Sequence, residues 1–310
     1  MVEAVVAPNS EPEVDRTLPR VAASPISAES PISTAKICNV TDFGAVADNF
    51  TNIGPAISSA FTKCVQNSPQ PTFLLPPGTY ALKLPVAVDG SNWTFRWQGN
   101  VIVPFNSSLH GNMVTCNAPN NWTFNGEGCI VDGQGHLWRT QGPFFPRLVQ
   151  ISNGSDFKFH GLTLLDSLMF HLDVVQGQRG EIFNITIEGA QIGATHGIDL
   201  SVIDMHVHHV RVTNRDECVT VKTPSNGILI EDVTCYFAGA TSQFGSYGGV
   251  TAVENVLIPR ITGVFGTRLE RDIVLMRLVL VGSANFTTKW FNGNPVPIPT
   301  DDPFTGSFTR

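Results

Sequence analysis

Four residues in the middle of the chain could carry acid–base chemistry. Asp216 and Glu217 stand side by side just before an apolar, β-branched segment, and His196 and Asp199 lie upstream of them. Two carboxyl groups held ~6.5–9.5 Å apart can act as general acid and general base with a water between them, as in inverting glycosidases. Crowding also raises the pKa of one carboxyl, as a general acid requires. The alternatives are that Asp216 and Glu217 are solvated turn residues and that Asp199 binds a neighbouring turn.

Three further side chains could bind a substrate. Lys222 ends the strand that follows Glu217 and could meet a substrate carboxylate, although a Lys in this position can equally be a solvated charge. Arg215 stands next to the acidic pair. Tyr247 could stack on a sugar ring. We therefore treat Lys222, Arg215 and Tyr247 as candidate substrate-binding residues.

A histidine-rich segment could suggest a metal. His206, His208 and His209 follow one another along a predicted strand. Alternate residues of a strand face opposite sides, and no carboxylate or Cys completes a ligand set in this segment. We therefore predict neither a metal site nor a cofactor.

The elements that must position these residues follow a repeat. A pattern of a small or polar residue followed by alternating apolar residues recurs every 23–25 residues. Its apolar centres are Leu162, Ile185, Val210, Val233 and Val256. Residues 277–281 would form the next copy, and Asn92–Phe95 and Asn121–Phe124 look like earlier copies of the same strand. Such a period suits one coil of a parallel β-helix, whose stacked coils bring distant carboxylates together. The alternative fold is a β-sandwich with accidental spacing.

The remaining segments set the domain boundaries. Residues 1–35 are rich in Pro, Ser, Ala and Glu and read as a flexible leader. The β-helix domain extends over residues 36–290, and residues 291–310 form a Pro- and Asn-containing tail, so that the domain could be truncated. Thr51–Cys64 carries Ile53, Ile57 and Phe61 on one helical face, and this helix should cap the first coil.

Composition excludes several partners. The net charge of −7 and the lack of a basic block argue against nucleic acid. No apolar run is long enough to span a membrane, and no signal peptide is visible. Eight Asn-x-Ser/Thr sequons nevertheless indicate an extracellular glycoprotein. They lie at Asn39, Asn49, Asn92, Asn106, Asn121, Asn153, Asn184 and Asn285.

Six cysteines fit the same compartment. They form three local pairs along the chain, and an even number suits three disulfides, with six buried free thiols as the alternative. The local pairs are Cys38 with Cys64, Cys116 with Cys129, and Cys218 with Cys235.

A family resemblance emerges at the acidic pair. Asn214–Pro224, with the sequence Asn-Arg-Asp-Glu-Cys-Val-Thr-Val-Lys-Thr-Pro, resembles the signature of rhamnogalacturonan hydrolases, a branch of glycoside hydrolase family 28. Thr195–Asp199, Gly245–Gly248 and Asp42–Val46 are similar to that family as well. The resemblance implies a right-handed parallel β-helix that hydrolyses pectic polysaccharide with inversion and without a metal. We expect a monomer.

The resemblance also implies residue roles. Asp216 would be the general acid and Glu217 a base that positions water, whereas His196 stands where the family has an aspartate. Local disulfides Cys38–Cys64 and Cys218–Cys235 are implied too. A polygalacturonase is the rival within the family, disfavoured by Glu217 and by a missing Arg-Ile-Lys element. A pectin-binding β-helix without turnover is the rival of another class, favoured by His196.

Overall fold

A computed structural model describes residues 35–117, 119–139, 147–191, 195–238, 240–244, 250–264, 273–275 and 278–281. These residues belong to one compact unit, Ala35–Arg310. Residues 1–34 of the predicted leader, the predicted tail and Tyr247 lie outside the described residues. No helix among the described residues is long and apolar enough to cross a membrane.

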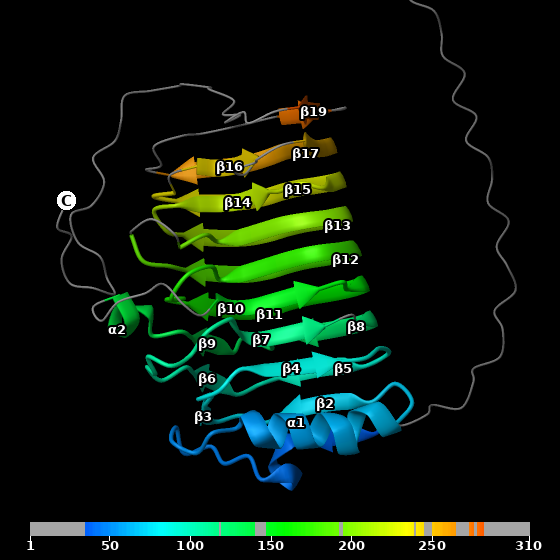
Figure 1. The fold of residues 1–310 in the computed structure, drawn as a ribbon, viewed down its shortest axis with the longest axis vertical. Coiled ribbons are helices and arrows are strands. Elements are labelled where there is room, and N and C mark those ends of the chain that lie inside the picture. The colour runs from blue at the N-terminus through cyan, green and yellow to red at the C-terminus, as the bar shows by residue number, and fades with distance from the viewer. Residues whose placement is uncertain are drawn as a thin grey trace, which may run out of the picture. The chain divides into compact units, whose positions relative to one another are not determined.

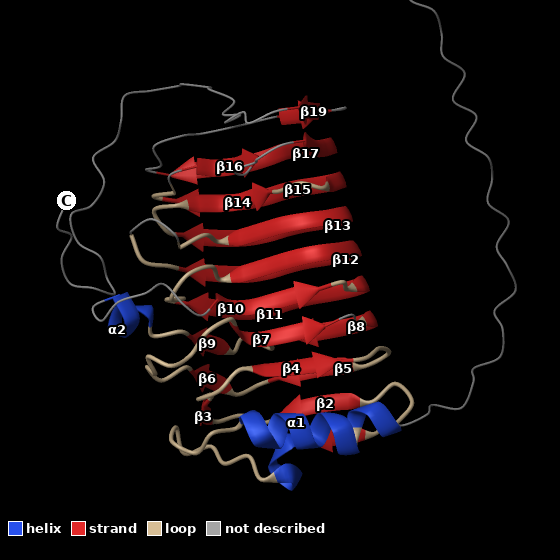
Figure 2. Ribbon diagram, viewed as in Figure 1, coloured by secondary structure: helices blue, strands red, loops and turns tan. Residues whose placement is uncertain are grey.

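The described chain is a stack of parallel strands (Figures 1 and 2). The strands are β1 Ile37–Asn39, β2 Thr72–Leu75, β3 Thr79–Ala81, β4 Val86–Asp89, β5 Thr94–Trp97, β6 Asn100–Ile102, β7 Asn112–Asn117, β8 Asn120–Asn125, β9 Ile130–Asp132, β10 Arg147–Ser152, β11 Ser155–Leu165, β12 Leu172–Glu188, β13 Ile198–Thr213, β14 Glu217–Val221, β15 Ser225–Tyr236, β16 Ala240–Phe244, β17 Val250–Val264, β18 Ile273–Leu275 and β19 Leu278–Val281. The helices are α1 Gly54–Lys63 and α2 Gly135–Arg139, with 3₁₀ turns at Val40–Phe43 and Val65–Asn67.

The strands form three faces, as expected for the predicted right-handed parallel β-helix. The β2 face contains β1, β2, β5, β8 and the parts of β11, β12, β13 and β15 that continue this stack. The β3 face contains β3, β6, β9 and the ends of the same long strands. The β4 face contains β4, β7, β10, the starts of β12 and β13, and then β14 and β16.

Left-handed residues turn the chain between faces. Gly161, Asn184, His209 and Asp232 occupy equivalent places on successive coils, and each has a φ between 51° and 79°. Gly, Asn, Asp and His are the residue types that enter this conformation most readily. The small or polar residue of the predicted repeat is therefore the corner that joins the β2 face to the β3 face.

The repeat was assigned correctly over four coils and wrongly beyond them. Leu162, Ile185, Val210 and Val233 pair in register as predicted. Val256 pairs instead with Ile228, and Ile261 pairs with Val233. The coil between β15 and β17 is longer than its predecessors, and Asn255 forms an earlier corner that has the same local pattern. β19 also departs from the prediction, because it pairs antiparallel with β17 instead of starting a new parallel coil.

The earlier copies of the repeat, Asn92–Phe95 and Asn121–Phe124, were assigned to the wrong strand. The reason is the same: two corners of one coil have similar sequences. They pair with each other as expected, but Phe124 pairs with Phe159 and not with Leu162. Both segments lie on the β2 face. The prediction that they repeat the strand of Leu162 was therefore wrong by one corner.

The inward side chains form continuous ladders. One ladder on the β2 face changes from aromatic to aliphatic along the stack, and all its members are at most 2% exposed. Its members are Phe73, Phe95, Phe124, Phe159, Ile182, Val207 and Ile230.

Helix α1 covers the first coil (Figure 1), as predicted. Ile57 and Phe61 are buried, and the Phe61 ring lies 5.9 Å from the Phe73 ring and 5.4 Å from that of Trp93. Apolar contact between the helix and the core ladder thus removes the open end of the solenoid from water.

Two of the three predicted cysteine pairs are disulfides. Cys38–Cys64 and Cys218–Cys235 are bonded. The third pair was wrong, because Cys116 and Cys129 are buried free thiols. Cys116 stacks between Val88 and Ile151 in an inward ladder and serves as a small apolar residue. Burial raises the pKa of both thiols to about 12.

Helix α2 was not predicted. Its five residues are too few to show a helical period in the sequence. The guanidinium of Arg139 pairs with the buried carboxylate of Asp166, and this ion pair fixes the helix to the solenoid.

Candidate active site

The predicted acidic residues meet on the β4 face. β13 and β14 are neighbours, with Ile198 opposite Val219 and Asp199 opposite Thr220. The N–H of Gly197 donates to the carbonyl of Glu217 at 2.9 Å, so His196 comes beside Glu217. A Cβ atom on Gly197 would stand 2.3 Å from the Cys218 carbonyl oxygen, so only glycine permits this close approach.

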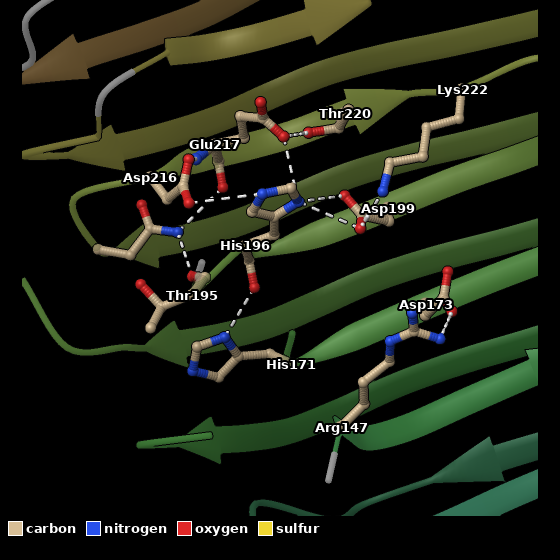
Figure 3. A network of polar contacts seen from close by, with 11 residues as sticks. Arg147, His171, Asp173, Thr195, His196, Asp199, Asp216, Glu217, Thr220 and Lys222 are labelled. Carbon is tan, nitrogen blue, oxygen red and sulfur yellow. Dashed lines mark hydrogen bonds and ion pairs between the residues drawn. The ribbon is translucent and has the colours of Figure 1, made fainter. Parts of the chain in front are cut away.

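His196 is the centre of the cluster (Figure 3). Its Nδ1 lies 2.9 Å from Asp199 Oδ1 and 3.1 Å from Glu217 Oε2, and its Nε2 lies 3.4 Å from Asp216 Oδ2. Only 14% of the side chain is exposed. Three carboxylates from two coils therefore share one imidazole.

The cluster changes the protonation of its members. Burial acts to lower the pKa of His196, but the bonds to Asp199 and Asp216 and the charges of Asp199 and Glu217 outweigh it and raise the pKa to about 9. Burial also raises the pKa of Glu217, with the nearby Asp216 and Asp199 adding to the effect, while His196 and Thr220 oppose it. His196 is accordingly a cation at neutral pH.

Asp199 is fully buried between two cations. Lys222 Nζ lies 2.6 Å from Asp199 Oδ2, and the same oxygen lies 3.2 Å from His196 Nδ1 (Figure 3). Lys222, a predicted substrate-binding residue, thus already holds a carboxylate of the protein. The interpretation of Asp199 as a residue that binds a neighbouring segment fits these contacts.

Asp216 and Glu217 approach each other beside the His196 ring. One oxygen of Asp216 lies within 4.8 Å of one oxygen of Glu217, and a nitrogen of His196 lies within the same distance of both. The ring contacts both carboxylates in the region that an attacking water would need.

Several supporting residues were not found from the sequence. Asn214, fully buried, donates from Nδ2 to the carbonyls of Thr195 and Glu217 and so joins the two segments of the site. His171, also buried, lies with Nδ1 2.8 Å from the His196 carbonyl and accepts from the Ser167 N–H through Nε2. Burial lowers the pKa of His171 to about 4, so it is neutral.

An aromatic ring with two cations adjoins the cluster. Phe170 stacks on His196 with ring centroids 4.1 Å apart. Lys222 Nζ and Arg147 Cζ lie 4.9 and 5.2 Å from the Phe170 centroid. Arg147 Nη1 donates to Asp173, which is opposite Asp199 in the register of β12 and β13. The coil period could have located Asp173, but the sequence holds no signal for Phe170 or Arg147.

The other predicted residues have mixed outcomes. Arg215 is exposed beside Asp216. A carboxylate does lie beside the His-rich segment, contrary to the prediction, because Glu181 is opposite His206 on the neighbouring coil. Donor atoms of Glu181, His206 and His208 all lie within 4.8 Å of one another.

Comparison with known sequences extends these observations. Residues 72–266 match the model of glycosyl hydrolases family 28. Rhamnogalacturonase A of Emericella nidulans is 35% identical over 237 residues, covering 75% of this chain and 46% of that protein. Rhamnogalacturonase A of Aspergillus aculeatus is 33% identical over 236 residues, covering 75% and 52%. The chain therefore spans about half the length of these curated relatives.

Solved structures share the fold. The endo-xylogalacturonan hydrolase of Aspergillus tubingensis superposes with a TM-score of 0.64 at 21% identity, over 75% of this chain and 66% of that one. The exopolygalacturonase of Thermotoga maritima gives a TM-score of 0.63 at 17% identity, over 75% and 67%. At these identities the likeness supports the β-helix alone.

Proposed function

The chain belongs to family 28 of the glycosyl hydrolases, and we propose that it hydrolyses the backbone of a pectic polysaccharide, with rhamnogalacturonan as substrate. The observation that carries this proposal is the gathering of Asp199, Asp216 and Glu217 around one imidazole on the β4 face. The names of the two relatives support the choice of substrate. We further propose that the protein works outside the cell as a monomer.

Asp216 and Glu217 would have different roles in the reaction. Asp216 gives its proton to the glycosidic oxygen as the bond to the anomeric carbon breaks, and Glu217 takes a proton from the water that attacks this carbon. Attack from the opposite side inverts the anomeric configuration. These roles follow the family resemblance and not the pKa shift, because burial raises the pKa of Glu217, the proposed base. Its action as a base therefore begins at a higher pH than that of an ordinary Glu carboxyl.

The cations beside the neighbouring aromatic ring suit an acidic sugar. Arg147 and Lys222 bring two positive charges close to Phe170, whose ring is stacked on His196. To meet one of these cations, the carboxylate of a uronic acid would take the place of Asp173 at Arg147 or of Asp199 at Lys222. This arrangement supports a galacturonate-containing backbone.

His196 would limit the rate. A positive imidazolium near the anomeric carbon repels the positive charge that develops in an oxocarbenium-like transition state. Its ring also contacts both members of the acidic pair. This observation favours a second candidate function, a β-helix that binds pectin with little or no turnover.

Replacing the proposed acid separates the two functions. Purified protein is incubated with rhamnogalacturonan and, separately, with polygalacturonate, and new reducing ends are measured. We expect release from rhamnogalacturonan and a loss of at least ~100-fold in Asp216→Asn. Asp204→Asn, an exposed corner carboxylate, is the control and should keep full activity. Background release by wild type and Asp216→Asn alike, with retained binding of the polymer, would leave only the binding function.

Replacing His196 tests whether its positive charge limits the rate of hydrolysis. His196→Asp replaces the cation by a carboxylate, and we expect the release rate to rise by ~10-fold or more. The double variant His196→Asp with Asp216→Asn should show no gain, because the proton donor is missing. A single variant no faster than wild type would contradict the role given to His196.

A further inference from the structure

A second cluster of ligand-type side chains lies on the β2 face, on coils that Figure 1 shows stacked as β11, β12, β13 and β15. Two outward ladders run next to each other there, and each crosses four successive coils. One ladder contains Lys158, Glu181, His206 and Leu229, and the other contains His160, Phe183, His208 and Glu231. The proposed function uses none of these residues.

The donor atoms converge from neighbouring coils. His208 Nε2 lies 3.0 Å from Glu181 Oε1, and His206 Nε2 lies 2.9 Å from Glu231 Oε1. The two imidazole rings are 4.2 Å apart. One donor atom each from Glu181, His206 and His208 lies within 4.8 Å of the other two. Tetrahedral ligands at Zn–N and Zn–O bonds of about 2.0–2.2 Å are about 3.4 Å apart, so small side-chain rotations suffice to close the set.

The surroundings hold the ligands in place. Phe183 stacks on His208 with an interplanar angle of 2°, which fixes the ring plane. His208 Nδ1 lies 2.6 Å from His209 Nδ1, so the nitrogen away from the cluster has its own hydrogen-bond partner. Such a bond at the far nitrogen is the usual companion of a metal-bound histidine. Side-chain exposure is 15% at His208 and 35% at His206, which leaves the cluster open to an ion from solution.

We propose that Glu181, His206 and His208 form a binding site for a divalent transition-metal ion, with zinc as the best match, and that Glu231 can provide a fourth ligand. Two imidazoles with carboxylates suit zinc, copper or nickel, whereas calcium and magnesium prefer oxygen ligands alone. A bound ion would join β12, β13 and β15. Its consequence is a clamp across three consecutive coils on the outside of the solenoid.

Two cations now occupy the carboxylates. Lys158 Nζ lies 3.0 Å from Glu181 Oε2, and Arg260 Nη2 lies 2.7 Å from Glu231 Oε2. Lys158 is 59% exposed and can swing away. Removing it should therefore strengthen zinc binding, an effect that a purely structural ion-pair network does not predict.

Equilibrium dialysis tests the site. The whole chain, freed of metal by a chelator, is dialysed against zinc chloride, and bound zinc is counted by mass spectrometry. We expect one zinc per chain, an affinity at least ~10-fold weaker in His206→Gln and in His208→Gln, and an affinity roughly 2–5-fold tighter in Lys158→Gln. The control is His160→Gln, which removes a histidine from the same face outside the ligand set and should leave binding unchanged.

Spectroscopy on the wild-type protein tests the site without depending on the folding of any variant. X-ray absorption of the zinc-loaded wild type should show nitrogen and oxygen ligands with two imidazoles, whereas zinc at the candidate active site would have the single imidazole of His196. Zinc should also raise the unfolding temperature of wild type but not of His206→Gln. The proposal is overturned by no bound zinc at about 1 mM, the weak end of the affinities of extracellular calcium modules, by one imidazole per zinc, or by unchanged affinity in both histidine variants.

Discussion

At the scale of single residues, the raised pKa of His196 has a measurable effect on stability. Its pKa rises from 6.5 to about 9 on folding. The stabilisation is therefore fully present below pH 6.5 and is lost as the pH rises through 9. We expect the free energy of unfolding to fall by up to roughly 3 kcal/mol between pH 6.5 and pH 9.5, measured by urea unfolding at each pH.

The matching variant isolates this contribution. His196→Gln cannot become a cation, so the difference between the unfolding free energies of wild type and variant should shrink over the same pH range. Groups that titrate elsewhere affect both proteins equally. Burial raises the pKa of Glu217 too, and this contribution is lost as the pH rises above 4.5, so it starts to change at a lower pH than that of His196. A constant difference between the two curves would mean that His196 is not protonated in the cluster.

The sequence predicted the acidic residues and His196 of the candidate active site but not the side chains that surround and support them. Asp199, Asp216, Glu217 and His196 could be brought together because the coil period fixes which residues are neighbours. Phe170 stacks on His196 from a loop, where no period operates. Supporting contacts such as the bond from His171 to the His196 carbonyl depend on backbone atoms, whose positions the sequence does not reveal.

At the scale of elements, the Cys38–Cys64 disulfide ties β1 to the end of the capping helix α1. The bond closes a loop with a sequence separation of 26 residues, and a loop of this size contributes about 3 kcal/mol by restricting the unfolded chain. Replacing both cysteines by Ala should lower the free energy of unfolding by about this amount. Urea unfolding followed by tryptophan fluorescence measures the loss.

Cys116→Ala gives the comparison for that double variant. Cys116 is a free buried thiol, so its replacement removes a little packing and no cross-link. If the double variant were no less stable than Cys116→Ala, the disulfide would contribute nothing to the attachment of the cap.

Corners explain both the success and the failure of the predicted repeat. Each corner needs a residue that tolerates a positive φ, followed by an alternating strand, so two corners of one coil resemble each other in sequence. Asn255 forms the corner equivalent to Gly227, whereas the repeat assigned it to that of Asp232. The coil between β15 and β17 is longer than its predecessors, so the spacing of 23 residues between Val233 and Val256 is coincidental. Register thus needs spatial pairing as well as period.

At the scale of the whole molecule, the solenoid has a graded core. Aromatic rings fill the ladder from Phe73 to Phe159, and aliphatic side chains continue it through Ile182, Val207 and Ile230. The candidate active site lies on β13 and β14, in the aliphatic part. Each coil contacts only its neighbours, so the two parts should respond separately to damage.

Phe124→Ala tests this separation. Phe124 is 2% exposed and contacts the rings of Phe95 and Phe159, so its truncation should cost about 3–5 kcal/mol. Hydrogen exchange read by mass spectrometry should show faster exchange in β5, β8 and β11, which flank the cavity. The amides of β14 and β15 should keep their protection, because β11, β12 and β13 lie between them and β8 in the stack. Uniform loss of protection from β5 to β15 would instead mean that the solenoid unfolds as one cooperative unit, in which damage to the aromatic coils also weakens the catalytic ones.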